Sequence, residues 1–319
     1  LGTPTDMKGG VVLYCSVSLR ARVANPGASY RVLETAGQKC RFGSRQDMQP
    51  RVDSFDGARA VLDYLRLPAI SCRVEYVSEI PLRSGMAGST ALVVALLRGL
   101  LAWQGRDVQL HHLAEQARYV ELNFLKVICG YQDAYMCTFG GLSYMDFRGK
   151  QFYRRAEAEL YATLEPLGAH VSHLPFVLAH TGVEHSSSAV HRPLRERWLE
   201  GEPAVVEGYK RITEIARAGK KALILGDWPS LGRLMNDNHA IQRALGGSGD
   251  SNERLISAAL DAGALGAKLA GAGDGGTIIS LWPWSNTTKL VDALTEAGAA
   301  SFYCPEVAPG VSVELDEGG

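Results

Sequence analysis

The sequence predicts an α+β fold with two lobes and a cleft between them. Alternating strand patterns and amphipathic helix patterns occur in clusters, without the strict alternation of strand and helix that a parallel sheet requires. Two glycine-rich turns lie far apart in the sequence, within residues 84–90 and 268–276. The 319 residues are 46% hydrophobic, which suffices for one large domain or two of moderate size.

The first half contains segments of both periodicities. Apolar and polar residues alternate in four segments, which are predicted as strands or a hairpin: 11–23, 30–43, 72–80 and 140–147. Apolar residues recur at helical spacing in three segments: 57–67, 91–105 and 112–128. The helix over 91–105 is apolar on most of its faces, so we expect it to be buried.

The second half is richer in helical patterns. We expect helices over four segments: 207–225, 228–245, 251–262 and 288–299. Short apolar runs predict strands over 176–180, 266–269 and 277–281. The last two of these strands flank the second glycine-rich turn.

Charge and cysteine usage exclude several classes of protein. The formal net charge is −1 with no strong block of like charge, so nucleic-acid and membrane-surface binding have no electrostatic support. The longest apolar runs are too short to cross a bilayer. The six cysteines are scattered without a CxxC pair, which favours free thiols, and we expect a cytoplasmic protein.

The first glycine-rich turn opens onto a helix in a way that suits phosphate. Residues 81–97 read PLRSGMAGSTALVVALL. Small residues let backbone N–H groups approach a ligand, and a helix N-terminus adds unpaired N–H groups and a positive dipole end. Close packing of the helix is the alternative. The turn lacks both the G-x-x-x-x-G-K-[ST] pattern and a dinucleotide fingerprint.

Two carboxylates between the turns are candidates for kinase chemistry. Glu121 falls near the end of a predicted helix, and Asp133 follows the turn that contains Gly130. One carboxylate beside a phosphate loop can bind Mg²⁺, and a second can orient or deprotonate an attacking hydroxyl. A solvent-exposed helix glutamate and a helix-capping aspartate remain the alternatives.

Three ordered segments resemble the GHMP kinase superfamily, which includes galactose, homoserine, mevalonate and phosphomevalonate kinases. Residues 2–10, GTPTDMKGG, are similar to the GEHTDYNGG motif of galactokinases. Residues 81–90 are similar to the ATP loop of the superfamily, P-x-x-x-G-L-x-S-S-[AT]. Residues 268–276, KLAGAGDGG, are similar to its third motif, K-x-[TS]-G-A-G-x-G-G. Residues 129–148 resemble the G-x-Q-D-Q-Y segment of heptose-phosphate kinases. Leu1 lies within the first motif, so we expect further residues before it.

The resemblance implies a two-lobed GHMP kinase fold, with an N-terminal lobe at residues 1–170, a C-terminal lobe at residues 171–319 and the active site in the cleft between them. It also implies a requirement for ATP and Mg²⁺ and a role for each matching residue. Asp133 is the implied catalytic carboxylate, and Ser89 and Glu121 are the implied Mg²⁺ ligands. The implied ATP contacts are Ser84, Gly85, Met86, Ala87, Gly88, Ser89, Thr90 and Gly273. The implied contacts to the acceptor are Asp6, Gly130, Gln132, Gly271 and Ser187.

The acceptor implied by the resemblance is a sugar or sugar phosphate phosphorylated at the anomeric carbon, such as D-glycero-D-manno-heptose 7-phosphate. Glucuronate, a galactose-like sugar, a mevalonate-type acid and a non-catalytic sugar sensor are the alternatives. Thr3 and Pro4 stand where the first motif usually has Glu-His, and Ala134 stands where Gln is usual. A homodimer stays open as the oligomeric state.

Two polar segments have both a functional and a structural interpretation. Residues 181–188, TGVEHSSS, are similar to a TG…S-S segment of heptose kinases, which would hold a substrate hydroxyl or phosphate. The alternative is a polar surface loop. Asn236, Asn238 and His239 fall at helical spacing, similar to an N-x-N-H segment near the substrate pocket of relatives, or form a polar helix face. Lys268 either supports the second glycine-rich turn or ends a strand.

Overall fold

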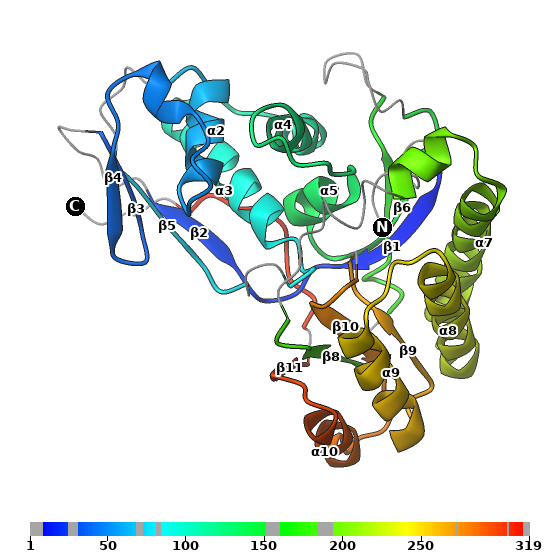
Figure 1. Cartoon of the computed structure of the whole chain (residues 1–319). Helices are drawn as coiled ribbons and strands as arrows, with labels where there is room; N and C mark the ends of the chain where they lie inside the picture. The colour runs from blue at the N-terminus through cyan, green and yellow to red at the C-terminus, as the bar shows by residue number, and fades with distance from the viewer. Residues whose placement is uncertain are drawn as a thin grey trace.

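The described residues of this computed structural model form three sheets with helices packed against them (Figure 1). The residues described are 9–24, 31–67, 73–80, 84–150, 160–171, 173–183, 194–271, 273–304 and 306–314. Two of the sheets are antiparallel and the third contains one parallel pair, and their combination with helices confirms the α+β prediction.

One sheet and four helices enclose the largest hydrophobic core. The sheet has the order β2-β5-β3-β4, built from β2 (Ala21–Ala24), β3 (Val32–Thr35), β4 (Gln38–Arg41) and β5 (Arg73–Ser78). A 3-10 helix, η1 (Arg45–Met48), precedes the four helices, which are α2 (Asp56–Tyr64), α3 (Gly88–Trp103), α4 (Leu110–Asn123) and α5 (Gln132–Phe139). In Figure 1 these helices gather above the sheet. Leu33, Val74, Leu97 and Leu113 are fully buried between the layers.

A second sheet joins the first core to a helical pair. The strands β1 (Val11–Cys15), β6 (Leu142–Asp146) and β7 (Thr163–Pro166) pair antiparallel in the order β1-β6-β7. The long helices α7 (Pro203–Leu225) and α8 (Trp228–Ala244) pack on one another, and their Leu223 and Leu231 share a hydrophobic cluster with Leu142 of β6.

The third sheet lies in the C-terminal half. It has the order β11-β8-β10-β9, with β8 (Phe176–His180), β9 (Gly266–Leu269), β10 (Thr277–Leu281) and β11 (Ser301–Tyr303). Helices α9 (Asp250–Ala262) and α10 (Thr288–Glu296) cover it through Leu255, Ala259 and Leu290. The hairpin β9–β10 encloses the second glycine-rich turn, which places that turn at the edge of this sheet.

The structure corrects the sequence prediction at several elements. A single strand over 11–23 is wrong, because Ser16 and Val17 pair with Gly141 and Val307 and turn the chain from β1 in one sheet to β2 in another. Helix α5 and strands β7 and β11 were not predicted, since each is short and carries no extended periodic pattern. The hairpin over 30–43 and the long helices are confirmed.

The division at residue 170 stays a prediction, although β7 and β8 belong to different sheets. Within the described ranges, no helix combines the length and the apolarity needed to cross a bilayer. The five cysteines among the described residues, Cys15, Cys40, Cys129, Cys137 and Cys304, are free thiols.

Candidate active site

The first glycine-rich turn leads directly into α3. Gly85 and Ala87 have φ angles of 74° and 57°, and α3 begins at Gly88. The methyl side chain of Ala87 cannot cap the helix, so the first N–H groups of α3 remain available to a ligand. Just before the turn, Ser84 Oγ is buried at 2% exposure and has no hydrogen-bond partner among the described residues. These features suit an anion held by backbone N–H groups.

A buried carboxylate faces the first turn of α3. Glu121 of α4 is only 2% exposed, and Thr90 Oγ1 lies 3.0 and 2.9 Å from its two carboxylate oxygens. Ser89 Oγ lies 3.3 Å from Glu121 Oε1, and Ser89 itself is exposed. The three side chains therefore form a cluster of oxygen atoms that opens toward solvent at Ser89. The exposed-glutamate alternative for Glu121 is wrong.

The environment of Glu121 favours its neutral form. Burial raises the pKa of Glu121 to about 7, and the negative charge of Asp133 adds to this effect. Hydrogen bonds from Thr90 and Ser89 and the positive charge of Arg118 oppose the rise. A cation bound beside the cluster would supply the compensating charge that the ligand-free protein lacks.

Asp133 is the second residue of α5, and Gln132 is the first. Burial raises the pKa of Asp133, while a hydrogen bond from the Gln132 side chain lowers it. Cys137 follows Asp133 by one helical turn, and the pKa of its thiol is raised by burial and by the charges of Asp133 and Glu121. These mutual effects mean that the two carboxylates share one partly dehydrated region. Gly130 lies in the turn just before α5.

The fold brings the two glycine-rich turns into contact. A Cβ atom on Gly271, which has a φ of +72°, would lie 2.9 Å from the carbonyl oxygen of Gly85. A Cβ on Gly273 would lie 1.7 Å from the carbonyl oxygen of Gly247, in the loop between α8 and α9. Backbone therefore meets backbone at both positions, which only glycine permits.

The second turn is held from behind by the first turn of α9. Asn252 is fully buried; its Oδ1 accepts from Gly275 N at 2.7 Å, and its Nδ2 donates to Gly275 O at 2.9 Å. The next residue, Glu253, lies 2.9 Å from His239 Nε2 and 2.6 Å from Ser248 Oγ. Sequence reasoning missed Asn252 because a single polar residue on a helix gives no pattern.

The polar residues of α8 have structural partners. Asn236 Oδ1 accepts from Ala267 N at 2.9 Å, which ties α8 to β9. His239 is buried against Glu253, and burial lowers its pKa. Lys268 on β9 donates to its neighbour Leu269 O at 2.6 Å, and burial lowers its pKa to about 8. These contacts favour structural roles for the three residues.

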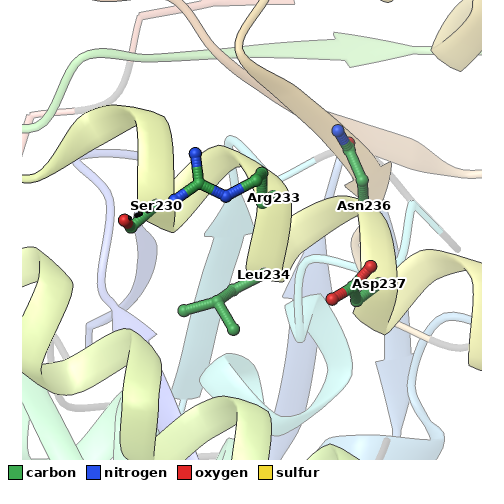
Figure 2. Close-up of a pocket in the computed structure, with 5 residues that line it drawn as sticks. All are labelled: Ser230, Arg233, Leu234, Asn236 and Asp237. Atoms are coloured by element: carbon green, nitrogen blue, oxygen red, sulfur yellow. Dashed lines mark hydrogen bonds between the residues drawn. The ribbon is translucent and has the colours of Figure 1, made fainter.

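The structure does not describe two of the predicted acceptor contacts. Asp6 and Ser187 lie outside the described residues. An open pocket of about 500 Å³ lies on α8 (Figure 2), and none of the carboxylates or hydroxyls of the cluster lines it. Its lining residues are Ser230, Arg233, Leu234, Asn236 and Asp237.

Comparison with known proteins gives two family matches. The model described as GHMP kinases N terminal domain matches residues 56–141, and the one described as GHMP kinases C terminal matches residues 220–300. The first match spans α2 to α5, and the second spans α8, α9 and the second glycine-rich turn.

Individual proteins of several specificities are similar to the chain. Glucuronokinase 1 of Arabidopsis thaliana is 28% identical over 79% of this chain and 69% of its own length. The D-glycero-alpha-D-manno-heptose 7-phosphate kinase of Campylobacter jejuni is 25% identical over 80% of this chain and 75% of its own length. The mevalonate kinase of Pyrococcus furiosus is 26% identical over 77% of this chain and 70% of its own length. The crystal structure of Lactococcus lactis galactokinase complexed with galactose shares the fold, with a TM-score of 0.77, 18% identity, and 97% of this chain and 91% of that chain covered.

Proposed function

The chain belongs to the GHMP kinase superfamily, and from that premise we propose that it transfers the γ-phosphoryl group of ATP to a hydroxyl group of a sugar or sugar phosphate. One observation carries the proposal. At the start of α3, just after the first glycine-rich turn, the hydroxyls of Ser89 and Thr90 lie against the buried carboxylate of Glu121. The charge of Asp133 acts on that carboxylate, and the first glycine-rich turn contacts the second.

In this proposal the triphosphate lies along the first turn and the start of α3. The backbone N–H groups of residues 85–90 would donate to phosphate oxygens, and the unpartnered hydroxyl of Ser84 adds a donor. The second turn would close over the same phosphates from the other side, since Gly271 contacts Gly85. Fixing the phosphates and the acceptor in line supplies most of the rate in phosphoryl transfer.

The cluster of Ser89, Thr90 and Glu121 fits a hard cation such as Mg²⁺. All its donor atoms are oxygens, as this ion prefers, and one carboxylate suffices when phosphates supply further ligands. No group of three or more His, Cys, Asp or Glu side chains suited to a metal occurs in the described part of the chain. Bound Mg²⁺ would neutralise the charge that develops on the β- and γ-phosphate oxygens.

Asp133 is the proposed general base. Its carboxylate would accept the proton of the acceptor hydroxyl as that oxygen bonds to the γ-phosphorus, while the bond from phosphorus to the bridging oxygen breaks and ADP leaves. A raised pKa makes a carboxylate a stronger base near neutral pH. The helix-cap alternative for Asp133 is wrong, because Tyr131 is the N-cap of α5 and Asp133 lies inside the helix.

The acceptor we propose is a heptose 7-phosphate-like sugar, phosphorylated at the anomeric carbon. The resemblance of residues 129–148 to heptose-phosphate kinases and the similarity to the Campylobacter jejuni protein support it. Ala134, which stands where relatives have Gln, is 1% exposed and lies in the core, so this substitution does not remove a side chain from the open side of α5. A mevalonate-type acceptor is the alternative, supported by the similarity to mevalonate kinase.

ADP release tests the proposal across four acceptors: D-glycero-D-manno-heptose 7-phosphate, glucuronate, galactose and mevalonate. We expect the heptose 7-phosphate to give the highest kcat/KM and, by ³¹P NMR, a 1,7-bisphosphate product. Asp133→Asn should bind ATP normally and turn over about 10²-fold more slowly. Turnover of mevalonate alone would establish the alternative acceptor, and saturable sugar binding without ADP release would establish a sensor. An Asp133→Asn enzyme of normal rate would remove Asp133 from the mechanism.

A further inference from the structure

Residues 306–311, which we call the C-terminal strap, return from the third sheet to the helix that carries Asp133. The chain leaves β11 at Tyr303, and in Figure 1 the red C-terminal trace rises from β11 toward the N-terminal helices. Val307 pairs with Val17, and Ala308 N donates to Ser16 O at 2.9 Å. The strap therefore connects β11 to the segment that follows β1.

The strap also contacts the C-terminal end of α5. Val311 N donates to Thr138 O at 3.1 Å, and Gly141 N donates to Ala308 O at 2.8 Å. The last carbonyl groups of a helix have no partner within the helix, so the strap satisfies one of them from outside. An eight-residue helix is not stable alone in water, which makes α5 depend on such external contacts.

Two glycines allow this contact. A Cβ on Gly140, the C-cap of α5, would lie 2.0 Å from Gly310 N, and a Cβ on Gly310 would lie 2.2 Å from Thr138 O. The neighbours are backbone atoms, which cannot rotate away as a flexible side chain can. The strap and α5 are thus in backbone contact, with no side chain between them.

Residues of the N-terminal part hold both partners. Arg20 Nη1 donates to Pro309 O at 2.7 Å, and Ser16 Oγ donates to Met136 O of α5 at 3.1 Å. Tyr14 Oη donates to Gly140 O at 3.1 Å. The end of α5 is therefore fixed on two sides, by β1 with the residues after it and by the strap.

We propose that the C-terminal strap is a positioning element for Asp133, a role that rests on the proposed function. Asp133 lies in the first turn of α5, and the strap fixes the last turn of the same two-turn helix. Shifting the strap tilts or slides α5 and moves the carboxylate relative to the phosphates. A displacement of about 1 Å at a reacting group lowers turnover by up to about 10²-fold.

The test compares Gly310→Ala with Gly168→Ala. The new methyl group at 310 would overlap backbone of α5, whereas Gly168 is exposed, has nothing within 4 Å of an added Cβ, and also has a φ outside the left-handed region. We expect Gly310→Ala to lower kcat at least about 10-fold with an unchanged ATP dissociation constant. The acid limb of its pH–rate profile should move to lower pH, because loosening α5 hydrates Asp133. Gly168→Ala should match the wild type throughout.

A milder variant covers the case in which Gly310→Ala fails to fold. Arg20→Ala removes the donor to Pro309 O from a partly exposed side chain, and it should lower kcat several-fold at unchanged ATP affinity. Arg217→Ala, which alters an exposed arginine of α7, is the control. The strap has no positioning role if folded Gly310→Ala or Arg20→Ala keeps wild-type kcat and pH profile while Asp133→Asn is slow. If Asp133→Asn is itself fully active, the proposed function loses its base, and the strap proposal is overturned with it.

Discussion

Replacing Glu121 with glutamine is expected to stabilise the ligand-free protein at alkaline pH while it weakens the enzyme. Burial raises the pKa of Glu121 from its ordinary 4.5 to about 7. A carboxyl group with a raised folded-state pKa binds protons more tightly in the folded chain than in the unfolded one. Its contribution to stability is fully present below pH 4.5 and is lost as the pH rises through 7.

The size of the effect follows from the shift. Each pKa unit corresponds to about 1.4 kcal/mol, so the charged carboxylate destabilises the folded state by roughly 3 kcal/mol well above pH 7. Between pH 5 and pH 8 the free energy of unfolding of the wild type should therefore fall by about 2–3 kcal/mol through this residue alone. Glu121→Gln cannot ionise and should lack this component of the pH dependence.

Urea denaturation of the metal-free and nucleotide-free proteins from pH 5 to pH 8 measures how the free energy of unfolding of wild type and of Glu121→Gln depends on pH. Glu207→Gln, which alters an exposed glutamate of α7, is the matched control and should follow the wild type. Turnover of Glu121→Gln should fall and its Mg²⁺ requirement should rise, because a charged oxygen ligand is lost. If the free energy of unfolding changes with pH by the same amount in wild type and Glu121→Gln, the claim that a charged Glu121 destabilises the folded protein is refuted.

The two glycine-rich turns give further predictions. Gly88→Val should keep the fold and weaken ATP binding at least about 10-fold, because a branched side chain would stand between backbone and phosphate. Gly99→Ala, farther along α3, should bind ATP as the wild type does. If calorimetric titration gives Gly88→Val and the wild type equal affinities for ATP, the phosphate site is contradicted. Asn252→Ala should lower the free energy of unfolding by about 2–4 kcal/mol, since two buried backbone groups of Gly275 lose their partners, and should raise the KM for ATP more than it lowers kcat. An unchanged KM in steady-state assays would show that the second turn keeps its shape without Asn252.

Sequence periodicity predicted the long elements because each has enough turns to repeat its pattern. Helix α3 is almost entirely apolar over 16 residues, and α4 repeats its buried positions over 14. Helix α5 has eight residues, of which Ala134, Tyr135 and Thr138 are buried, and that is too little to distinguish a helix from a turn. Its stability comes from contacts to β1 and the strap, which are distant in sequence.

The candidate site was predictable where a motif carries it, and less so where packing completes it. The motif resemblance pointed to Ser89, Glu121 and Asp133; the structure places Ser89 against Glu121, and the charge of Asp133 acts on the same carboxylate, while their roles stay predictions. Nothing local indicated that Asn252 would hold Gly275, or that residues 306–311 would reach α5. Such contacts depend on the register of sheets and on helix packing, which one sequence does not encode in any single window.

A buried ion pair beside α5 limits how this part of the chain can change during evolution. Lys150 and Glu115 form a salt bridge with side chains 0% and 1% exposed, and Tyr135 of α5 donates its phenolic proton to the same carboxylate. Replacing one charged partner breaks a buried ion pair, at a cost of about 3–5 kcal/mol, whereas exchanging both for apolar residues of similar volume is often neutral. A single substitution at either charged position is therefore costly, and the two positions should change together. We expect Lys150, Glu115 and Tyr135 to be either all retained or all replaced among related proteins.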